Sequence, residues 1–369
     1  MAAAVSPSLR NEPAPRNEAP PRSEPAPRDE ATLRNEARDS VADDPAAATT
    51  FFPSPDAMEE EIGTVMAVKL SDELKRWAEG YGQVGHRNPF LWNWCRRGVE
   101  VTMLSCVEAS LADAVCDTRV LGIMLDVLLD DIADHQKDLA FLEQLLAVFE
   151  SGARPAEDAF APHQRAYAGF TLDVWEEIQR RVREFPRYAE FAELLRFDYR
   201  QLFNVMRYSR LLNEYPEMFN LVEHDLYTPH NMHMMISATM DLMCSPAFDR
   251  SELAILREVV WRAQCMGRIG NLVTTWQREI GEEDFTSGVF ARAISCGDLA
   301  VSDLWSGNRT YIEMVIKREQ HEEFFLRRWQ TYRREILALR TRSGSVNVTE
   351  LVAGLQKLIC LHLGSRGKK

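Results

Sequence analysis

Hydrophobic residues recur at helical spacing along almost the whole chain from about residue 60 onward. In residues 121–138 five apolar side chains fall on one helical face: Leu121, Met124, Leu125, Leu128 and Leu129. Side chains three or four positions apart share a face of an α-helix, whereas a half-buried strand alternates every second residue. Strand-like alternation is rare in this chain, so the pattern predicts an all-α protein.

Further helices are expected wherever the same spacing continues between likely breaks. The breaks are Gly- or Pro-containing positions: Ser151-Gly152, Tyr215-Pro216, Thr228-Pro229, Ser245-Pro246 and Gly281. The helices predicted between and after them cover residues 139–150, 164–182, 188–212, 231–244, 250–280, 287–305, 309–340 and 348–363. Because nothing indicates a second folded domain, we expect one helical bundle over residues 60–365.

The first 55 residues differ from the rest. Between residues 8 and 50 a six-residue unit rich in Arg, Glu and Pro repeats, beginning with Arg10-Asn11-Glu12 and returning as Arg16-Asn17-Glu18. Such a segment has too little apolar surface to offset the entropy lost on ordering. We therefore expect residues 1–55 to form a disordered tail.

Charge and cysteine content narrow the class of protein. The chain has a formal net charge of −13, and nonspecific nucleic-acid binding needs a basic face. Its seven cysteines form no C-x-x-C pair, which favours buried thiols in a reducing cytoplasm. No run of 18 apolar residues is present, and no signal peptide is evident. We expect a cytoplasmic protein that binds no nucleic acid and has no membrane span.

An acidic row lies at the end of the strongly apolar stretch. Asp130, Asp131 and Asp134 form a D-D-x-x-D motif, and Asp126 and Asp138 extend the row at intervals of four. Like charges at this spacing repel each other, and the C-terminal half of a helix disfavours anions. A magnesium ion would relieve that repulsion, because it prefers carboxylate oxygens. The alternative is an acidic face in solvent, partly neutralised by Lys137.

A second polar stripe follows 141 residues after Asp130. Asn271, Thr275 and Glu279 are each four residues apart, so their side chains stack along one face of a helix. All three offer oxygen, which suits magnesium rather than zinc or copper. Taken alone, the stripe also fits an ordinary polar helix face.

Together the two motifs resemble the metal-binding pair of class I terpene synthases, with the spacing of a divergent bacterial-type member. The resemblance covers roughly residues 70–345 and implies an all-α bundle around a central active-site cavity. It implies an enzyme that uses three Mg²⁺ ions to ionise an isoprenyl diphosphate and directs the carbocation to a terpene. By this resemblance Asp130 binds two ions, Asp134 is a secondary ligand and Asp131 orients its neighbours. Asn271, Thr275 and Glu279 chelate the third ion.

The resemblance also implies groups for the diphosphate and the hydrocarbon. Arg278, directly before Glu279, would contact the diphosphate. Phe90 and Trp94 share a helical face and are the best candidates for the pocket wall. Trp276 lies one residue past Thr275 and is expected to point away from the metals.

The chain departs from the family in two places. The arginine expected before the second motif is absent from residues 222–231, and four residues are candidate substitutes: His224, His230, Arg207 and Arg210. A late Arg-Tyr pair is absent where Lys357-Leu358 stands. The nearest equivalents are Arg309 and Tyr311, which we assign to diphosphate binding.

Two alternatives stay open. An isoprenyl diphosphate synthase, or a squalene/phytoene-type condensing enzyme, would also bind metal, although such enzymes generally use two Asp-rich motifs. A non-catalytic helical interaction protein would carry the acidic row in solvent. The candidate substrates are farnesyl diphosphate, geranylgeranyl diphosphate and a cyclised C20 diphosphate. The motifs do not decide among them, and they predict neither the product nor whether the protein is a monomer or a homodimer.

Overall fold

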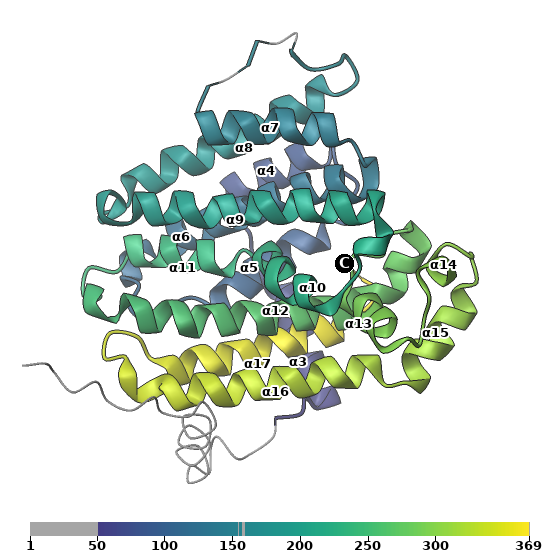
Figure 1. Ribbon diagram of the computed structural model, residues 1–369. Helices are drawn as coiled ribbons and strands as arrows, with labels where there is room; N and C mark the ends of the chain where they lie inside the picture. The colour runs from purple at the N-terminus through teal and green to yellow at the C-terminus, as the bar shows by residue number, and fades with distance from the viewer. Residues whose placement is uncertain (1–50, 154, 157–158, 369) are drawn as a thin grey trace, which may run out of the picture. The chain divides into compact units, whose positions relative to one another are not determined.

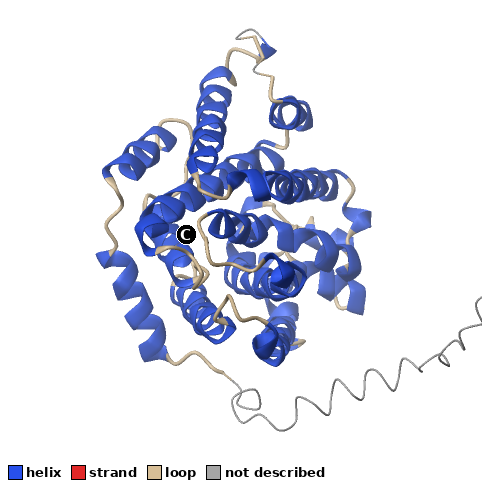
Figure 2. Cartoon of the chain, turned by 90° about the vertical axis from the view of Figure 1, so that its left-hand side faces the viewer, coloured by secondary structure: helices blue, strands red, loops and turns tan. Residues whose placement is uncertain are grey.

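A computed structural model describes residues 51–153, 155–156 and 159–368. Within them the chain forms fifteen α-helices and no strand. Figure 2 shows helices joined by loops throughout this part of the chain. The predicted all-α fold is therefore confirmed. The helices are α3 Pro55–Ala67, α4 Asp72–Tyr81, α5 Phe90–Val101, α6 Ala112–Asp130, α7 Leu139–Ser151, α8 Arg165–Glu184, α9 Tyr188–Glu214, α10 Leu221–Tyr227, α11 Met234–Met243, α12 Leu253–Glu282, α13 Gly288–Cys296, α14 Val301–Leu304, α15 Arg309–Arg318, α16 His321–Leu339 and α17 Val348–Gly364.

The expected tail lies outside the described residues as far as residue 50. Its last part is attached to the bundle, because the Phe51 amide donates to Gln330 Oε1 at 3.1 Å and the Phe51 ring packs on Trp329. α3 begins at Pro55, earlier than expected, because Ser54 caps it by accepting from the Ala57 amide.

α6 is the central helix of the bundle. The five apolar residues that predicted it are all 0 % exposed, and α5, α8 and α11 pack around it. A helix that is buried on nearly every side is enclosed by neighbours rather than lying at the surface. The acidic row at the end of α6 therefore sits inside the molecule.

α12 lies on the other side of the interior. It packs against α11, α16 and α17, and the last two run beside it in Figure 1. α17 in turn contacts α5 closely, because a Cβ on Gly354 would lie 1.7 Å from the Val101 carbonyl oxygen. Only glycine permits that approach. These contacts arrange α5, α6, α11, α12 and α17 around one space.

Two of the predicted long helices are interrupted. The stretch 287–305 divides into α13 and α14 because Gly297 adopts a positive φ of 77° and ends α13. The stretch 309–340 divides into α15 and α16 at Gln320, which has a φ of 55°. Hydrophobic periodicity continues across both breaks, so it did not reveal them.

Two expectations drawn from composition have structural counterparts. All seven cysteines are among the described residues and none forms a disulfide, although Cys296 is exposed rather than buried. Among the described helices, none has a stretch long and apolar enough to cross a membrane.

Candidate active site

A cavity of about 200 Å³ lies between α5, α6, α11, α12 and α17. One end carries six carboxylates and three arginines: Asp126, Asp130, Asp134, Glu279, Glu282, Asp284, Arg87, Arg268 and Arg278. The rest is mostly apolar, with Leu91, Trp94, Val99, Ile123 and Val127 among its lining residues. The space therefore joins a strongly charged end to a hydrocarbon-compatible interior.

The acidic wall is formed where α6 ends. The backbone passes directly from Asp130 into a π-helical turn, Asp131–Gln136. Such turns insert one residue into the α-helical repeat and occur often at functional sites. Asp130 and Asp134 both line the cavity here, and Asp134 is only 4 % exposed. An acidic face in solvent is thereby ruled out.

Amide groups from two other elements hold these carboxylates. Asn231 donates from Nδ2 to Asp130 Oδ1 at 3.1 Å, and Asn213 donates from Nδ2 to Asp134 Oδ1 at 3.0 Å. Burial, together with the nearby carboxylates of Asp284 and Asp130, raises the pKa of Asp134 well above its usual range. A cation placed here would favour the charged form of these groups.

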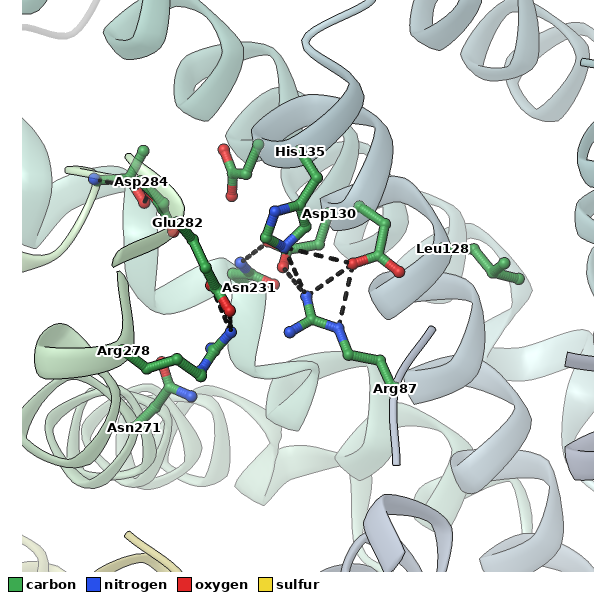
Figure 3. A network of polar contacts seen from close by, with 12 residues as sticks. Arg87, Leu128, Asp130, His135, Asn231, Asn271, Arg278, Glu282 and Asp284 are labelled. Atoms are coloured by element: carbon green, nitrogen blue, oxygen red, sulfur yellow. Dashed lines mark hydrogen bonds and ion pairs between the residues drawn. The ribbon is translucent and has the colours of Figure 1, made fainter. Parts of the chain in front are cut away.

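Asp131 is turned towards Arg87 rather than towards the cavity. Arg87 donates to Asp131 Oδ1 from Nε at 3.1 Å and from a terminal nitrogen at 2.7 Å, and Tyr81 donates to Oδ2 at 3.1 Å. The same guanidinium lies 3.6 Å from Asp130 Oδ2 and 3.3 Å from His135 Nε2. Figure 3 shows the side chains of Arg87, Asp130 and His135 turned towards one another. Asp131 thus positions Arg87 beside Asp130, which fits its expected orienting role.

The fourfold row does not extend as far as Asp138. Lys137 adopts a left-handed φ of 54° and ends the π-helical turn, and Asp138 then caps α7 by accepting from the Phe141 amide. Lys137 does not neutralise the acids, because its amino group donates to the Glu283 carbonyl. The row is therefore Asp126, Asp130 and Asp134.

The opposite wall belongs to the regular part of α12. Asn271, Thr275 and Glu279 all line the cavity, as their spacing predicted. Arg268 lies one turn earlier on the same face and donates to Asn271 Oδ1 at 2.9 Å. The two oxygen-bearing stripes therefore face the same space.

Glu279 carries an unsatisfied carboxylate oxygen at this wall. The residue is 7 % exposed, and its Oε2 has no hydrogen-bond partner among the described residues. Burial and the neighbouring Asp284 raise the pKa of Glu279 to about 8. Asp284 comes close because Glu283 adopts a left-handed φ of 55° and ends α12, so that the Asp284 amide donates to the Glu279 carbonyl.

Arg278 also lines the cavity, where it is paired with an acid. Its guanidinium donates to both carboxylate oxygens of Glu282, at 2.6 and 2.5 Å (Figure 3). Trp276 points away, as expected: it is fully buried and donates from Nε1 to Glu322 at 2.5 Å.

Besides Asp131, three predicted site residues are not brought to the cavity wall. Arg309 is paired with Glu313 at 2.9 Å and donates to the Gln277 carbonyl, on the outer side of α12. Tyr311 is 37 % exposed. On α5, Trp94 lines the cavity but Phe90 does not; Leu91 takes the place expected for Phe90.

The proposed substitutes for the missing arginine also lie elsewhere. His224 is buried against Gly288 and within hydrogen-bonding distance of Thr228, and His230 packs on Trp261. Arg207 pairs with Glu143 and Glu150, and Arg210 donates to the Lys137 carbonyl. None of the four lines the cavity; Arg87, Arg268 and Arg278 supply its positive charge at the acidic end.

Several residues of the cavity were not predicted from the sequence. Arg268 had a usable signal, because it lies one helical turn before Asn271. Asp284 follows an acidic pair after the second motif, which is a weaker signal. Arg87 and Asn231 had none, since each reaches Asp130 from a distant part of the chain.

The donors at the acidic end fit a hard divalent cation that arrives with an anion. Carboxylate, amide and hydroxyl oxygens predominate, and Asp126 Oδ1 and Glu279 Oε2 are buried without partners in the described part of the chain. No three His, Cys, Asp or Glu side chains among the described residues lie close enough together to hold an ion alone. Magnesium commonly completes its coordination shell with phosphate oxygens. This suits a site whose protein ligands are divided between two walls of the cavity.

Comparison with known proteins identifies the fold. No protein-family model and no curated protein matches the sequence. Among solved structures the chain is similar to isoprene synthase from grey poplar leaves (Populus x canescens), with a TM-score of 0.54 and 12 % identity over 83 % of this chain. It is equally similar to abietadiene synthase from Abies grandis, with a TM-score of 0.55 and 11 % identity over 85 % of this chain.

The likeness covers only part of these larger proteins. The chain spans 53 % of the isoprene synthase chain and 38 % of the abietadiene synthase chain. A second isoprene synthase structure, in complex with three Mg²⁺ ions and dimethylallyl-S-thiolodiphosphate, aligns with a TM-score of 0.56 and 11 % identity. At these identities the comparison shows a class I terpene synthase-like fold.

Proposed function

We propose that this chain is a magnesium-dependent class I terpene synthase. It would ionise an isoprenyl diphosphate, release diphosphate and direct the carbocation to a terpene hydrocarbon or alcohol. One observation carries the proposal: the Asp130–Asp134 turn and the Asn271–Glu279 stripe face one cavity whose other part is mostly apolar. The similar fold of an isoprene synthase that holds three Mg²⁺ ions and a diphosphate analogue supports it.

Five oxygen-bearing residues would hold the ions. Asp130 and Asp134 would do so from the acidic wall, and Asn271, Thr275 and Glu279 from α12. Bound Mg²⁺ would neutralise the diphosphate and stabilise the charge that develops on it as it leaves. Three ions, as in the isoprene synthase complex, are part of the proposal.

The arginines of the cavity would orient the diphosphate. Arg268 and Arg278 lie on the same face of α12 as the proposed ligands, and Arg87 lies beside Asp130. Guanidinium groups match phosphate oxygens with paired hydrogen bonds. Release of Arg278 from Glu282, or of Arg268 from Asn271, would supply these donors.

The apolar part of the cavity would hold the hydrocarbon chain. Leu91, Val99, Ile123 and Val127 exclude water, which would otherwise capture the carbocation. The Trp94 ring lines the same wall and can stabilise positive charge through its π face.

The test is incubation with dimethylallyl, geranyl, farnesyl and geranylgeranyl diphosphates and with a cyclised C20 diphosphate, each with Mg²⁺ or with EDTA. Diphosphate release and hydrocarbon or alcohol products are expected only with Mg²⁺ and with at least one of these substrates. If no substrate releases diphosphate, the proposal is wrong. Formation of longer prenyl diphosphates when isopentenyl diphosphate is added would instead identify a chain-elongating enzyme, which the Asn/Thr/Glu second motif disfavours.

A further inference from the structure

A serine–histidine pair lies at the end of the cavity remote from the acidic wall. Ser237 lines the cavity beside Met234, and its Oγ lies 3.2 Å from Nδ1 of His233. Ser237 is 4 % exposed and His233 is 1 % exposed, so the pair is closed off from bulk solvent. A hydroxyl backed by an imidazole is an arrangement that can accept and pass on a proton.

The position of the pair along α6 is set by a glycine. A Cβ on Gly122 would lie 2.4 Å from Cε1 of His233, so the imidazole occupies the space that a side chain would fill. Gly122 lies eight residues before Asp130 on the same helix, which corresponds to about 12 Å along its axis at 1.5 Å per residue. The pair therefore lies about two helical turns from Asp130 and about one turn from Asp126.

The imidazole is held in place and kept neutral. His233 adopts a φ of 58° directly before α11, and the Tyr199 ring packs against it at 5.8 Å between centroids. Burial, together with the positive charge of Arg119, lowers the pKa of His233 to about 3. In the tautomer that carries its proton on Nε2, the neutral ring can accept a hydrogen bond from Ser237 through Nδ1.

Two other polar residues of the cavity wall, Thr102 and Arg119, are already occupied. Thr102 donates to the Gly98 carbonyl at 2.8 Å and accepts from Arg119 at 2.9 Å. Arg119 is ion-paired with Asp241 at 3.1 Å, and its guanidinium has no proton-accepting atom. Two competing acceptors also line the cavity. Asp126, nearer the acidic wall, has an unpartnered Oδ1 among the described residues, and the His362 ring packs on Trp94.

We propose that Ser237, backed by His233, accepts the proton whose loss ends the carbocation reaction. This inference rests on the proposed function. The diphosphate end is too far away to act as the base for a cation whose charge has reached the closed end of the cavity. The chain itself must then supply an acceptor there, and the Ser237 hydroxyl lies on the cavity wall.

The proposed step conserves atoms and electrons. The C–H bond beside the cationic carbon breaks, and its electron pair forms a C=C bond. The proton passes to Ser237 Oγ as the hydroxyl proton moves to His233 Nδ1, which becomes an imidazolium. Because this charged form is strongly disfavoured by burial, the proton returns through Ser237 to water when the product leaves.

The experiment compares product ratios, which do not depend on the overall rate. Ser237→Ala should lower the ratio of the main hydrocarbon to all other products at least about tenfold, since general bases commonly contribute 10²–10⁴-fold. Ser237→Thr, which keeps a hydroxyl, should restore much of the ratio. Ser245→Ala is the matched control: this buried serine follows the same helix, donates to the Asp241 carbonyl and does not line the cavity.

Two further variants make the result decisive. His233→Gln should shift the ratio in the same direction, and combining it with Ser237→Ala should add little, because the two residues would act as one unit. An unchanged ratio in folded Ser237→Ala, or a shift seen only with Asp126→Asn, would overturn the inference. Failure of the proposed function looks different, because the unmodified protein would then release no diphosphate.

Discussion

The two walls of the cavity carry similar oxygen donors on different backbones. α12 is a regular helix from Leu253 to Glu282, and its three predicted ligands stand on one face. α6 stops at Asp130 and continues as a π-helical turn, in which Asp134 faces the cavity and Asp131 faces Arg87. On the regular wall, spacing alone predicted which side chains meet.

The difference shows where a spacing argument holds. A fourfold spacing places residues on one face only while the helix keeps its period. Asp138 lies four residues after Asp134 but belongs to the cap of α7, because the backbone changes at Lys137. The irregular wall also depends on partners from elsewhere in the chain, namely Arg87, Asn231 and Asn213. The following variants test these distinctions.

The largest effect is expected at Asp130. Asp130→Ala should lower the rate of diphosphate release about 10³-fold, because it removes a charged group placed at the centre of charge development. Asp138→Ala is the matched variant, because Asp138 continues the fourfold spacing in the sequence but does not line the cavity. It should keep near-normal activity and lose about 1 kcal/mol of stability as the cap of α7. Steady-state kinetics measure the rate of diphosphate release, and urea denaturation measures the free energy of unfolding. An equal loss of activity in the two variants would show that Asp138 also acts in the site.

The second prediction concerns the pH dependence of stability without Mg²⁺. The folded protein keeps a proton on Glu279 up to about pH 8, whereas the unfolded chain loses it near pH 4.5. Rising pH therefore favours unfolding between these values, by up to about 5 kcal/mol in total at about 1.4 kcal/mol per pH unit. Glu279→Gln should remove this contribution to the fall in the free energy of unfolding, because glutamine does not titrate.

Urea denaturation at pH 5, 6.5 and 8 in EDTA measures the Glu279 effect. Adding Mg²⁺ with inorganic diphosphate should reduce the loss of stability at high pH in the unmodified protein, because a bound cation favours the charged form of Glu279. Parallel stability curves for the two proteins across this pH range would contradict the prediction.

The third prediction distinguishes the contacts of Arg87 with Asp131 and Asp130 from an ordinary surface ion pair. Arg87→Ala should lower activity about 10–100-fold, the usual range for residues that orient metal ligands. Arg87→Lys should recover only part, because lysine lacks the planar fork that binds Asp131 through two nitrogens. Arg207→Ala, which breaks pairs with Glu143 and Glu150 away from the cavity, should leave activity unchanged. Equal effects of Arg87→Ala and Arg207→Ala on activity would contradict the role of Arg87 in orienting the acidic residues of the site.

The smallest effect is expected from adjacent threonines on the regular wall. Thr275 lines the cavity, whereas Thr274 donates to the Gly270 carbonyl and does not line it. Thr275→Val should lower activity about tenfold, the loss expected when one hydrogen-bonding or metal-binding oxygen of about 1.4 kcal/mol is removed. Thr274→Val should retain activity. If the two variants behave alike in kinetic assays, the helical facing of this wall is wrong.

Local pattern was enough to predict much of this molecule. The apolar stripe of α6 is buried as expected, and α12 turns Asn271, Thr275 and Glu279 to one side because a regular helix repeats every 3.6 residues. Both features depend on neighbours within a few turns. Family resemblance added the pairing of the two motifs, which spacing alone does not provide.

Tertiary structure decided the rest, because it depends on how distant segments pack. The left-handed Lys137 that ends the π-helical turn separated Asp138 from the row, and the cavity took its arginines from residues 87 and 268 rather than 309. The partnership of Ser237 and His233 is local, one turn apart at the start of α11. Its place on the cavity wall is not, because that depends on the missing side chain of Gly122, more than 100 residues earlier in the chain.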